Sequence, residues 1–367
     1  MRMATFYEAL KHKNRISMSL LKRPDVYGVG VGYANPNKPA SGAGINVYTR
    51  KNIAATSVQN LKMLMAAVGT NVPVRFIGSS KFRANAAASK PKLVRPTLFN
   101  RRVRPVPGGT SIGKVDPFST GTGGLVVIKN NQLYILSNNH VIVKNNSTAF
   151  AETVQPGPAD AGRSGTDRIG RLFQFVPLRP AGVNFQDSAI SIPTSNSLLN
   201  PRYLVSSSGA LITLSGHLTS YPVGLQLMKS GRTTGFVRGT VEANNADVNV
   251  NYGGTLGTIM FRNQSIIRGN VGAVSLPGDS GSVWLRSDRF AAALNFAGSE
   301  NGRVSISNPL GVIMSTYGVR VAVPAAGGRF RAGAIRGAAQ KGNFAYVQPL
   351  TRAERKRTRA IFAKPSQ

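Results

Sequence analysis

The chain has 367 residues and no cysteine, which excludes disulfide bonds and thiolate metal sites and fits a reducing compartment. Its 46 lysine and arginine residues outnumber 13 aspartate and glutamate residues, so the formal net charge is +33 at pH 7. A field of this sign attracts polyanions such as nucleic acid, and no apolar run is long enough to predict a membrane-spanning helix.

The N-terminal part predicts a basic arm followed by a small α+β unit. Residues 1–24 have the pattern of a short basic amphipathic helix or arm. Residues 25–84 then contain strand, strand, helix and strand patterns in that order, at residues 26–34, 42–50, 57–68 and 72–80. We expect this β-β-α-β unit to pack on the rest of the chain, because so few strands rarely fold alone.

The remaining chain divides into a linker, an all-β region and a tail. Residues 85–109 are rich in proline and basic residues, which predicts an extended linker. Residues 110–323 are short β-branched and aromatic runs between Gly, Asn and Ser turns, which favours a two-barrel architecture. Residues 324–367 are basic and predict a flexible tail with a short helix near its end.

The stretch "LPGDSGSVWL" places Ser280 on a glycine-flanked turn just before an apolar strand. Gly, Asp and Ser are ordinary turn residues, so a simple turn is one interpretation. The other is a nucleophilic serine with backbone N–H groups directed at a developing oxyanion. A serine nucleophile needs a general base and a carboxylate that orients the base.

Few residues can supply that base and that carboxylate. The chain has only His12, His140 and His217. His140 follows a strand pattern in "YILSNNHVIV", and Asp187 precedes an alternating strand in "QDSAISIP". Alone, each has an ordinary structural role, but His140, Asp187 and Ser280 together make a stronger joint signal for a base, a carboxylate and a nucleophile.

These segments resemble the signature regions of chymotrypsin-like serine proteases, namely "LYILSNNHV", "DSAIS" and "PGDSGSVW". The segments "VQPGPAD", "KSGRTTGFVRGTV" and "YGVGVGY" resemble a narrower group, the bacterial and phage relatives of the plant Narrow Leaf trypsin-like proteases. The resemblance implies a mostly β fold. It would be a chymotrypsin-like double β-barrel, with residues 110–323 as a trypsin-like peptidase domain and the small α+β unit before it.

The same resemblance implies a serine endopeptidase that works through an acyl-enzyme, without metal or cofactor. Ser280 would be the nucleophile, His140 the general base and then acid, and Asp187 the residue that orients the imidazole. The backbone N–H groups of Gly278 and Ser280 would form the oxyanion hole.

The substrate pocket is predicted to be apolar. Trypsin-type enzymes carry an acid six residues before the nucleophile, because a buried cationic side chain needs a paired charge. Here Val274 occupies that position, and Phe296, Ala297 and Gly298 are expected to form a pocket wall. We therefore expect an apolar residue before the cut bond, with broad specificity.

A second function stays open at this point. A catalytically silent protease-fold scaffold that binds nucleic acid through its basic surface would use the net charge and would not need His140. The expected partners are a protein or peptide substrate and, in the second hypothesis, nucleic acid or another polyanion, with no membrane. A homo-oligomer is left open. The chain lacks a Sec-type signal, so we expect a cytoplasmic location, with virion association or another export route as alternatives.

Overall fold

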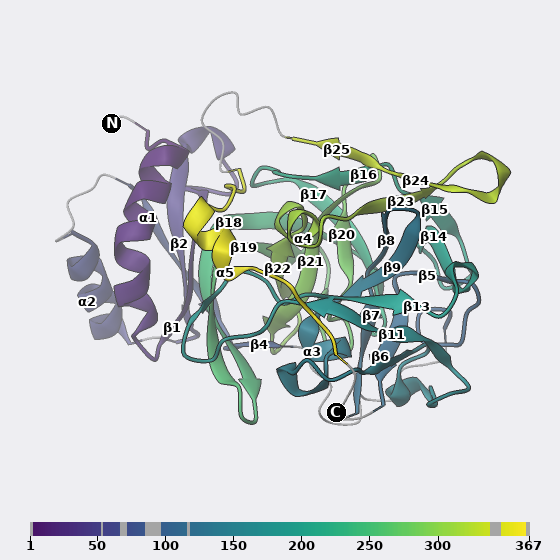
Figure 1. The fold of residues 1–367 in the computed structure, drawn as a ribbon. Helices are drawn as coiled ribbons and strands as arrows, with labels where there is room; N and C mark the ends of the chain where they lie inside the picture. Colours follow the sequence, from purple (N-terminus) through teal and green to yellow (C-terminus); the bar gives the residue numbers. More distant parts are fainter. Residues whose placement is uncertain are drawn as a thin grey trace.

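The computed structural model describes residues 3–52, 54–66, 72–84, 97–115, 118–337 and 346–364. Strands predominate, and Figure 1 shows an N-terminal unit with two helices beside two curled sheets. No helix in these ranges is long and apolar enough to cross a membrane.

The first sheet closes into a barrel of six strands. Only Gly124 separates β7 from β8, so these two strands act as one bent strand in the ring. The ring runs β6–β7/β8–β9–β13–β11–β10 and returns to β6. The bounds are β6 Thr110–Lys114, β7 Ser119–Gly123, β8 Leu125–Lys129, β9 Gln132–Ser137, β10 Glu152–Val154, β11 Arg168–Phe175 and β13 Ala189–Pro193.

The second sheet also closes, through pairings β17–β18–β19–β22–β21–β20 and back to β17. Its strands are β17 Gln226–Gly231, β18 Gly235–Gly253, β19 Gly257–Gly269, β20 Val283–Leu285, β21 Phe290–Ser299 and β22 Val304–Pro309. Wholly buried apolar side chains, such as those of Leu136, Val283 and Leu294, form a cluster shared by strands of both barrels. The predicted mostly β class with a double β-barrel is confirmed.

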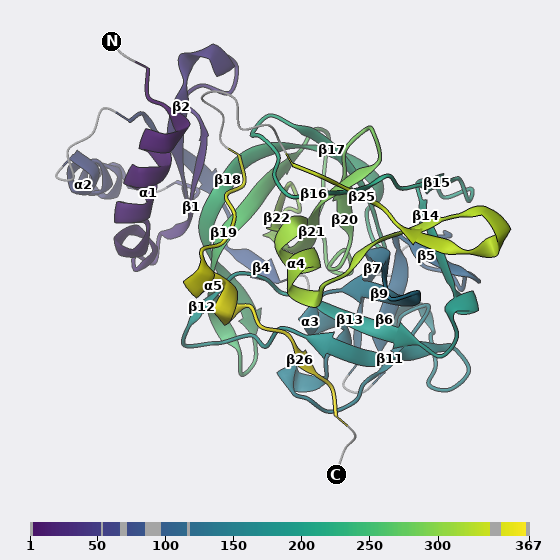
Figure 2. The same ribbon diagram turned by 45° about the horizontal axis from the view of Figure 1, so that its top comes forward.

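The N-terminal unit extends the second barrel's sheet. Its order after α1 is strand, strand, helix and strand, as the sequence predicts. β1 pairs antiparallel with β18 and with β2, and β2 pairs parallel with β3 across α2. The helices cover the outer side of these strands (Figures 1 and 2). The unit therefore packs on the barrel as expected. Its bounds are α1 Phe6–Leu21, β1 Val26–Tyr33, β2 Ala43–Arg50, α2 Ala55–Ala66 and β3 Val74–Ser79.

Short strands connect the N-terminal unit and the C-terminal part of the chain to the barrels. β4 (Phe82–Ala84) leads from the N-terminal unit to β18 and β21 (Figure 2). After the second barrel, β23 pairs with β8, β25 with β16, and β26 with β11. The remaining bounds are α3 Asn139–Ile142, α4 Leu310–Tyr317, α5 Arg352–Arg357, β5 Val106–Gly108, β12 Val183–Asn184, β14 Leu199–Leu204, β15 Leu211–Thr213, β16 Gly216–Leu218, β23 Arg320–Pro324, β24 Phe330–Ala332, β25 Ala334–Arg336 and β26 Ile361–Phe362.

A buried ion pair ties α1 to the second barrel. Lys13 Nζ lies 2.7 Å from Oδ2 of Asp247 on β18, and both side chains are almost wholly buried. Ser17 Oγ donates to the same carboxylate oxygen at 2.7 Å. Burial lowers the pKa of Lys13, while the Asp247 charge acts in the opposite direction. This carboxylate therefore compensates a cation that the fold removes from water.

Replacing Asp247 with Asn should leave Lys13 buried without a carboxylate partner. We expect the free energy of unfolding to fall by about 3–5 kcal/mol, measured by urea denaturation. Asp288→Asn is the control, because Asp288 pairs with Arg286 and Arg336 at a half-exposed site where an ion pair contributes about 0–1 kcal/mol. An equal fall in the two variants would contradict this account.

Candidate active site

His140 and Asp187 lie together at the ends of neighbouring strands of the first barrel. β9 leads into α3, which carries His140, and Asp187 precedes β13, which pairs with β9. Nδ1 of His140 lies 2.5 Å from Oδ2 of Asp187, and the His140 backbone N–H donates to Oδ1 at 3.4 Å. Asp187 is wholly buried, and the His140 side chain is 5% exposed.

Three further residues hold Asp187 in place. Asn308 Oδ1 accepts the Asp187 backbone N–H at 3.1 Å, and Asn138 Nδ2 donates to the Asp187 carbonyl at 2.6 Å. The Tyr252 hydroxyl donates to Oδ2 at 2.6 Å. The Tyr252 ring also meets the His140 ring edge to face, with centroids 5.6 Å apart.

Tyr252 was not predicted as a site residue, and no motif in the sequence marks it. It lies near the end of β18, at the hairpin with β19. Burial and, next, the negative charge of Asp187 raise the pKa of Tyr252 well above its ordinary value of 10.0. The phenol is therefore a hydrogen-bond donor to the carboxylate throughout the neutral pH range.

Ser280 comes from the second barrel, in the loop between β19 and β20. Its Oγ donates to the carbonyl of Phe296 at 3.2 Å. His140 Nε2 is buried and has no hydrogen-bond partner among the described residues. The structure thus joins His140 to Asp187 but turns the Ser280 hydroxyl toward β21.

The serine loop and the His140 segment meet at Gly121. A Cβ added there would lie 2.6 Å from Val141 Cγ2 and 2.8 Å from the Ser280 carbonyl oxygen. The absence of a side chain at Gly121 therefore allows the two loops to approach each other from opposite barrels.

The backbone of the serine loop leaves alternate N–H groups without acceptors. Gly278 has φ +100° and Gly281 has φ +91°, values in the left-handed region that favours glycine. The N–H of Asp279 donates to the Leu276 carbonyl, and that of Gly281 donates to the Asn295 carbonyl, each at 2.9 Å. Within the described part of the chain, no acceptor meets the N–H of Gly278 or of Ser280. These two N–H groups can bind an anion.

The Asp279 carboxylate holds the serine loop in place through hydrogen bonds to backbone N–H groups. Its carboxylate accepts the backbone N–H groups of Leu276 at 2.9 Å and of Thr233 and Thr234 at 3.0 Å each. Lys229 Nζ lies 4.0 Å away, and both side chains are wholly buried. Burial lowers the pKa of Lys229, against the opposite effect of the Asp279 charge. Asp279 is thus a structural acceptor that connects the serine loop to the turn between β17 and β18.

A second buried ion pair supports the same loop. Arg232 Nη2 lies 2.5 Å from Oδ1 of Asp160. The Arg232 backbone N–H donates to Thr122 Oγ1 at 3.0 Å, and that hydroxyl donates to the Gly278 carbonyl at 2.9 Å. The segments "VQPGPAD" and "KSGRTTGFVRGTV" therefore meet behind the serine loop.

The four residues predicted for the substrate pocket lie in two parts of the structure. Val274 is in the loop before Ser280, and Phe296, Ala297 and Gly298 are on β21. Val274 is wholly buried in a cluster that contains Ile267 and Trp284. Phe296 is also wholly buried, with its ring 4.7 Å from that of Phe261. The next two residues of β21, Ala297 and Gly298, pair with β4. The preference for an apolar residue before the cut bond stays a prediction.

The other two histidines lie on separate elements, His12 on α1 and His217 on β16. Burial, followed by the charge of Arg320, lowers the pKa of His217 to about 4. No group of three His, Asp or Glu side chains that could hold a metal ion occurs in the described residues.

Comparisons with solved structures yield bacterial serine proteases. One is a glutamic acid specific serine protease, with 24% identity over 59% of this chain and 100% of that chain, at a TM-score of 0.44. Protease A of Thermobifida fusca is 19% identical over 62% of this chain and 99% of its own, at 0.43. Cellulomonas bogoriensis chymotrypsin is 25% identical over 59% and 97%, at 0.42. No protein-family model and no curated protein matches the chain.

The chain has the chymotrypsin-like double β-barrel fold, which its two closed six-stranded rings define.

Replacing Tyr252 with Phe should remove one of the hydrogen bonds to the buried Asp187 carboxylate. A hydrogen bond to a charged group contributes about 1.5–3 kcal/mol, so we expect the free energy of unfolding to fall by that amount. Tyr7→Phe is the matched control, because Tyr7 is 74% exposed. Urea denaturation measures both variants, and an unchanged Tyr252→Phe would show that this hydroxyl does not support Asp187.

Proposed function

We propose that the chain is a serine endopeptidase in which Ser280, His140 and Asp187 form the catalytic triad. The observation that carries the proposal is the buried hydrogen bond between His140 Nδ1 and Asp187, at 2.5 Å. With Nδ1–H donated to the carboxylate, the lone pair of Nε2 is left to accept a proton. Nε2 has no other partner among the described residues, as a general base requires.

The first chemical step begins with a rotation of Ser280 Oγ from the Phe296 carbonyl toward Nε2. His140 then takes the hydroxyl proton while Oγ adds to the carbonyl carbon of the substrate. Asp187 stabilises the imidazolium that forms, and Tyr252 keeps the carboxylate in position. The N–H groups of Gly278 and Ser280 donate to the developing oxyanion.

Collapse of this intermediate breaks the C–N bond and leaves an acyl-enzyme on Ser280. His140 passes the proton to the leaving amine and then activates a water molecule, which hydrolyses the ester and regenerates the hydroxyl. Every proton in this sequence moves through Nε2, so the orientation of the imidazole by Asp187 is a requirement of both halves of the reaction.

The narrower family likeness, the substrate preference, the cellular location and the oligomeric state are proposed from the sequence alone. The likeness to the relatives of the plant Narrow Leaf proteases depends on the motifs "VQPGPAD", "KSGRTTGFVRGTV" and "YGVGVGY", and the apolar substrate preference depends on Val274. A cytoplasmic location and a homo-oligomer stay predictions of the same kind.

Hydrolysis of a peptide library tests the proposed activity directly. We expect Ser280→Ala to lower kcat by about a millionfold, because loss of the nucleophile removes the contribution of the whole triad. Ser207→Ala is the control, because this serine is exposed in the loop between β14 and β15. Equal hydrolysis by wild type and Ser280→Ala would overturn the proposal, and the residues preferred before the cut bond would test the apolar pocket.

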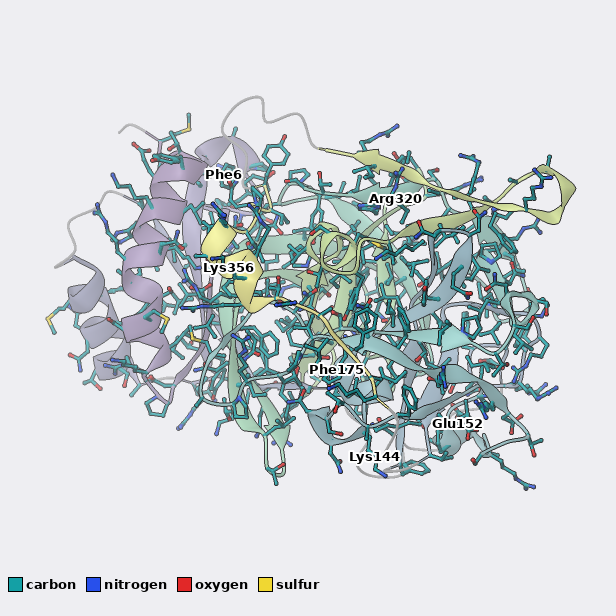
Figure 3. All side chains as sticks on the ribbon, in the orientation of Figure 1. Phe6, Lys144, Glu152, Phe175, Arg320 and Lys356 are labelled. Carbon is teal, nitrogen blue, oxygen red and sulfur yellow. The ribbon has the colours of Figure 1, made fainter. Side chains whose placement is uncertain are left out.

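Nucleic-acid binding is a second candidate function, favoured by a cationic groove on the C-terminal part. A groove of about 1040 Å³ borders α5 and is lined by Arg352, Arg355, Lys356 and Arg359. Lys356 extends from this helix in Figure 3. Arg355 donates to the Leu350 carbonyl at 2.6 Å, and the other three cations have exposed side chains. Such a cluster can neutralise phosphates without reading a base sequence.

The salt dependence of binding to random duplex DNA tests this second function. Changing Arg352, Lys356 and Arg359 to Ala should reduce the slope of log affinity against log salt by about 2–3, at about 0.9 for each phosphate that is no longer neutralised. The control changes three other exposed arginines, Arg202, Arg329 and Arg331, to Ala. No electrophoretic shift at low salt, or equal slopes for both triple variants, would rule out the groove as the binding site.

A further inference from the structure

The side chain of Thr233 holds one peptide plane of the serine loop. Its hydroxyl donates to the carbonyl oxygen of Pro277 at 2.6 Å. Among the described residues, no other donor meets this carbonyl. The same peptide plane contains the N–H group of Gly278, which is one of the two N–H groups of the serine loop that can bind an anion. The Thr233 hydroxyl therefore acts on a group that the proposed reaction uses.

The direction of the Pro277 carbonyl determines the direction of that N–H group. The peptide between Pro277 and Gly278 is trans. In a trans peptide the C=O and the N–H point to opposite sides of the chain. With the carbonyl directed at Thr233, the Gly278 N–H points away from Thr233, and no acceptor within the described ranges meets it. This N–H is thus left to bind an oxyanion.

A glycine at position 278 leaves this peptide plane with little restraint of its own. Gly278 has φ +100°, and glycine populates positive and negative values of φ about equally well. A Cβ added at this residue would lie 2.5 Å from Thr233 Oγ1 and 2.9 Å from Arg232 Cδ, so the loop packs directly on these two side chains. The hydrogen bond from Thr233 therefore restricts a peptide that glycine alone would leave free to rotate.

Arg232 fixes the Thr233 hydroxyl as a donor to the loop. Arg232 Nη1 donates to Thr233 Oγ1 at 3.2 Å, and a guanidinium group has no lone pair with which to accept a hydrogen bond. The single hydroxyl proton is therefore directed at the Pro277 carbonyl. Arg232 is itself held by Asp160, whose Oδ2 accepts from Arg232 Nε at 2.9 Å, and both of these side chains are buried.

The peptide plane on the other side of Gly278 is held in a similar way. The Gly278 carbonyl accepts the hydroxyl of Thr122 at 2.9 Å. Thr122 lies on β7 of the first barrel, and Thr233 lies in the turn between β17 and β18 of the second. The backbone N–H of Thr233 donates to Asp279 Oδ1 at 3.0 Å, which anchors that turn to the serine loop. One threonine hydroxyl from each barrel thus fixes each plane that adjoins Gly278.

We propose that Thr233 is a positioning residue for the oxyanion hole, because its hydroxyl holds the Pro277 carbonyl so that the Gly278 N–H faces the carbonyl oxygen of the substrate. This inference rests on the proposed peptidase function and deepens it. Thr233 acts through the backbone of Gly278 and not on the substrate itself. Since negative charge develops on the substrate oxygen only during the reaction, the effect of Thr233 belongs to the transition state and not to substrate binding.

A pair of substitutions isolates the hydroxyl of Thr233. Thr233→Ala and Thr233→Ser both remove the methyl group, and only Thr233→Ala also removes the hydroxyl. Loss of a whole oxyanion donor lowers kcat by about a hundredfold to a thousandfold, so we expect Thr233→Ala, which keeps the N–H but not its direction, to lower kcat by about tenfold to a hundredfold. Steady-state hydrolysis of a library peptide should give an unchanged KM in Thr233→Ala and a kcat near that of wild type in Thr233→Ser.

Inhibition by a peptidyl trifluoromethyl ketone gives a second readout, which a merely structural role of Thr233 would not change. Ser280 Oγ bonds to the ketone carbon, the hydroxyl proton passes to His140, and the ketone oxygen becomes an oxyanion like that of the reaction. The inhibition constant should therefore rise in Thr233→Ala by about the factor by which kcat falls. An equal fall of kcat in Thr233→Ala and Thr233→Ser, or a rise in KM without a fall in kcat, would overturn the proposal. Thr233→Val, which keeps the size of the side chain, replaces Thr233→Ala if urea denaturation shows that the latter does not fold.

The behaviour of wild type separates the role of Thr233 from the proposed function. A wild type that hydrolyses peptides, with the same kcat in Thr233→Ala, would overturn the role of Thr233 and leave the peptidase function standing. A wild type that neither hydrolyses peptides nor is labelled at Ser280 by a fluorophosphonate probe would overturn the proposed function, and the inference with it.

Discussion

The arrangement of the site depends on the burial of one carboxylate, that of Asp187. A wholly buried charge is costly unless hydrogen bonds compensate it. The donors to this carboxylate, His140 and Tyr252, come from different barrels, since His140 follows β9 and Tyr252 lies on β18. The two barrels must therefore pack against each other before the Asp187 carboxylate has both of these hydrogen bonds, and the bond to His140 fixes the orientation of the imidazole.

The strand β18 links this site to the N-terminal unit. Along its length Asp247 pairs with Lys13 of α1, and Tyr252 donates to Asp187. The same strand pairs with β1 and with β4. The N-terminal unit is thus continuous with the sheet that carries the site, and β4 brings it to the edge next to Ser280.

Much of the fold follows from periodicity in the sequence. Short apolar, β-branched and aromatic runs between turn residues indicate the strands of the N-terminal unit and of both barrels. His140 could be selected because the chain has only three histidines, and Ser280 because two glycines flank it. The close contact of His140 with Asp187 follows from the pairing of β9 with β13, which their order along the chain only suggests.

Other parts of the site could not be predicted from sequence. Tyr252 follows an ordinary strand pattern, and only the closed barrel brings its hydroxyl to Asp187. The rotamer that points Ser280 to Phe296 depends on local packing. β4 has three residues, too few for a periodic pattern, and its partner on β21 lies more than 200 residues further along the chain. The short strands β25 and β26 likewise pair with strands far away in the sequence, β16 and β11.

The central claim is that His140, oriented by Asp187, activates Ser280. Mass-spectrometric mapping of the fluorophosphonate adduct tests it most directly, because the adduct records which hydroxyl is nucleophilic. The account predicts a single adduct on Ser280 in wild type and its loss in His140→Ala, with Ser280 still present and the fold unchanged by circular dichroism. An adduct on another residue, or equal labelling of Ser280 in wild type and His140→Ala, would contradict it.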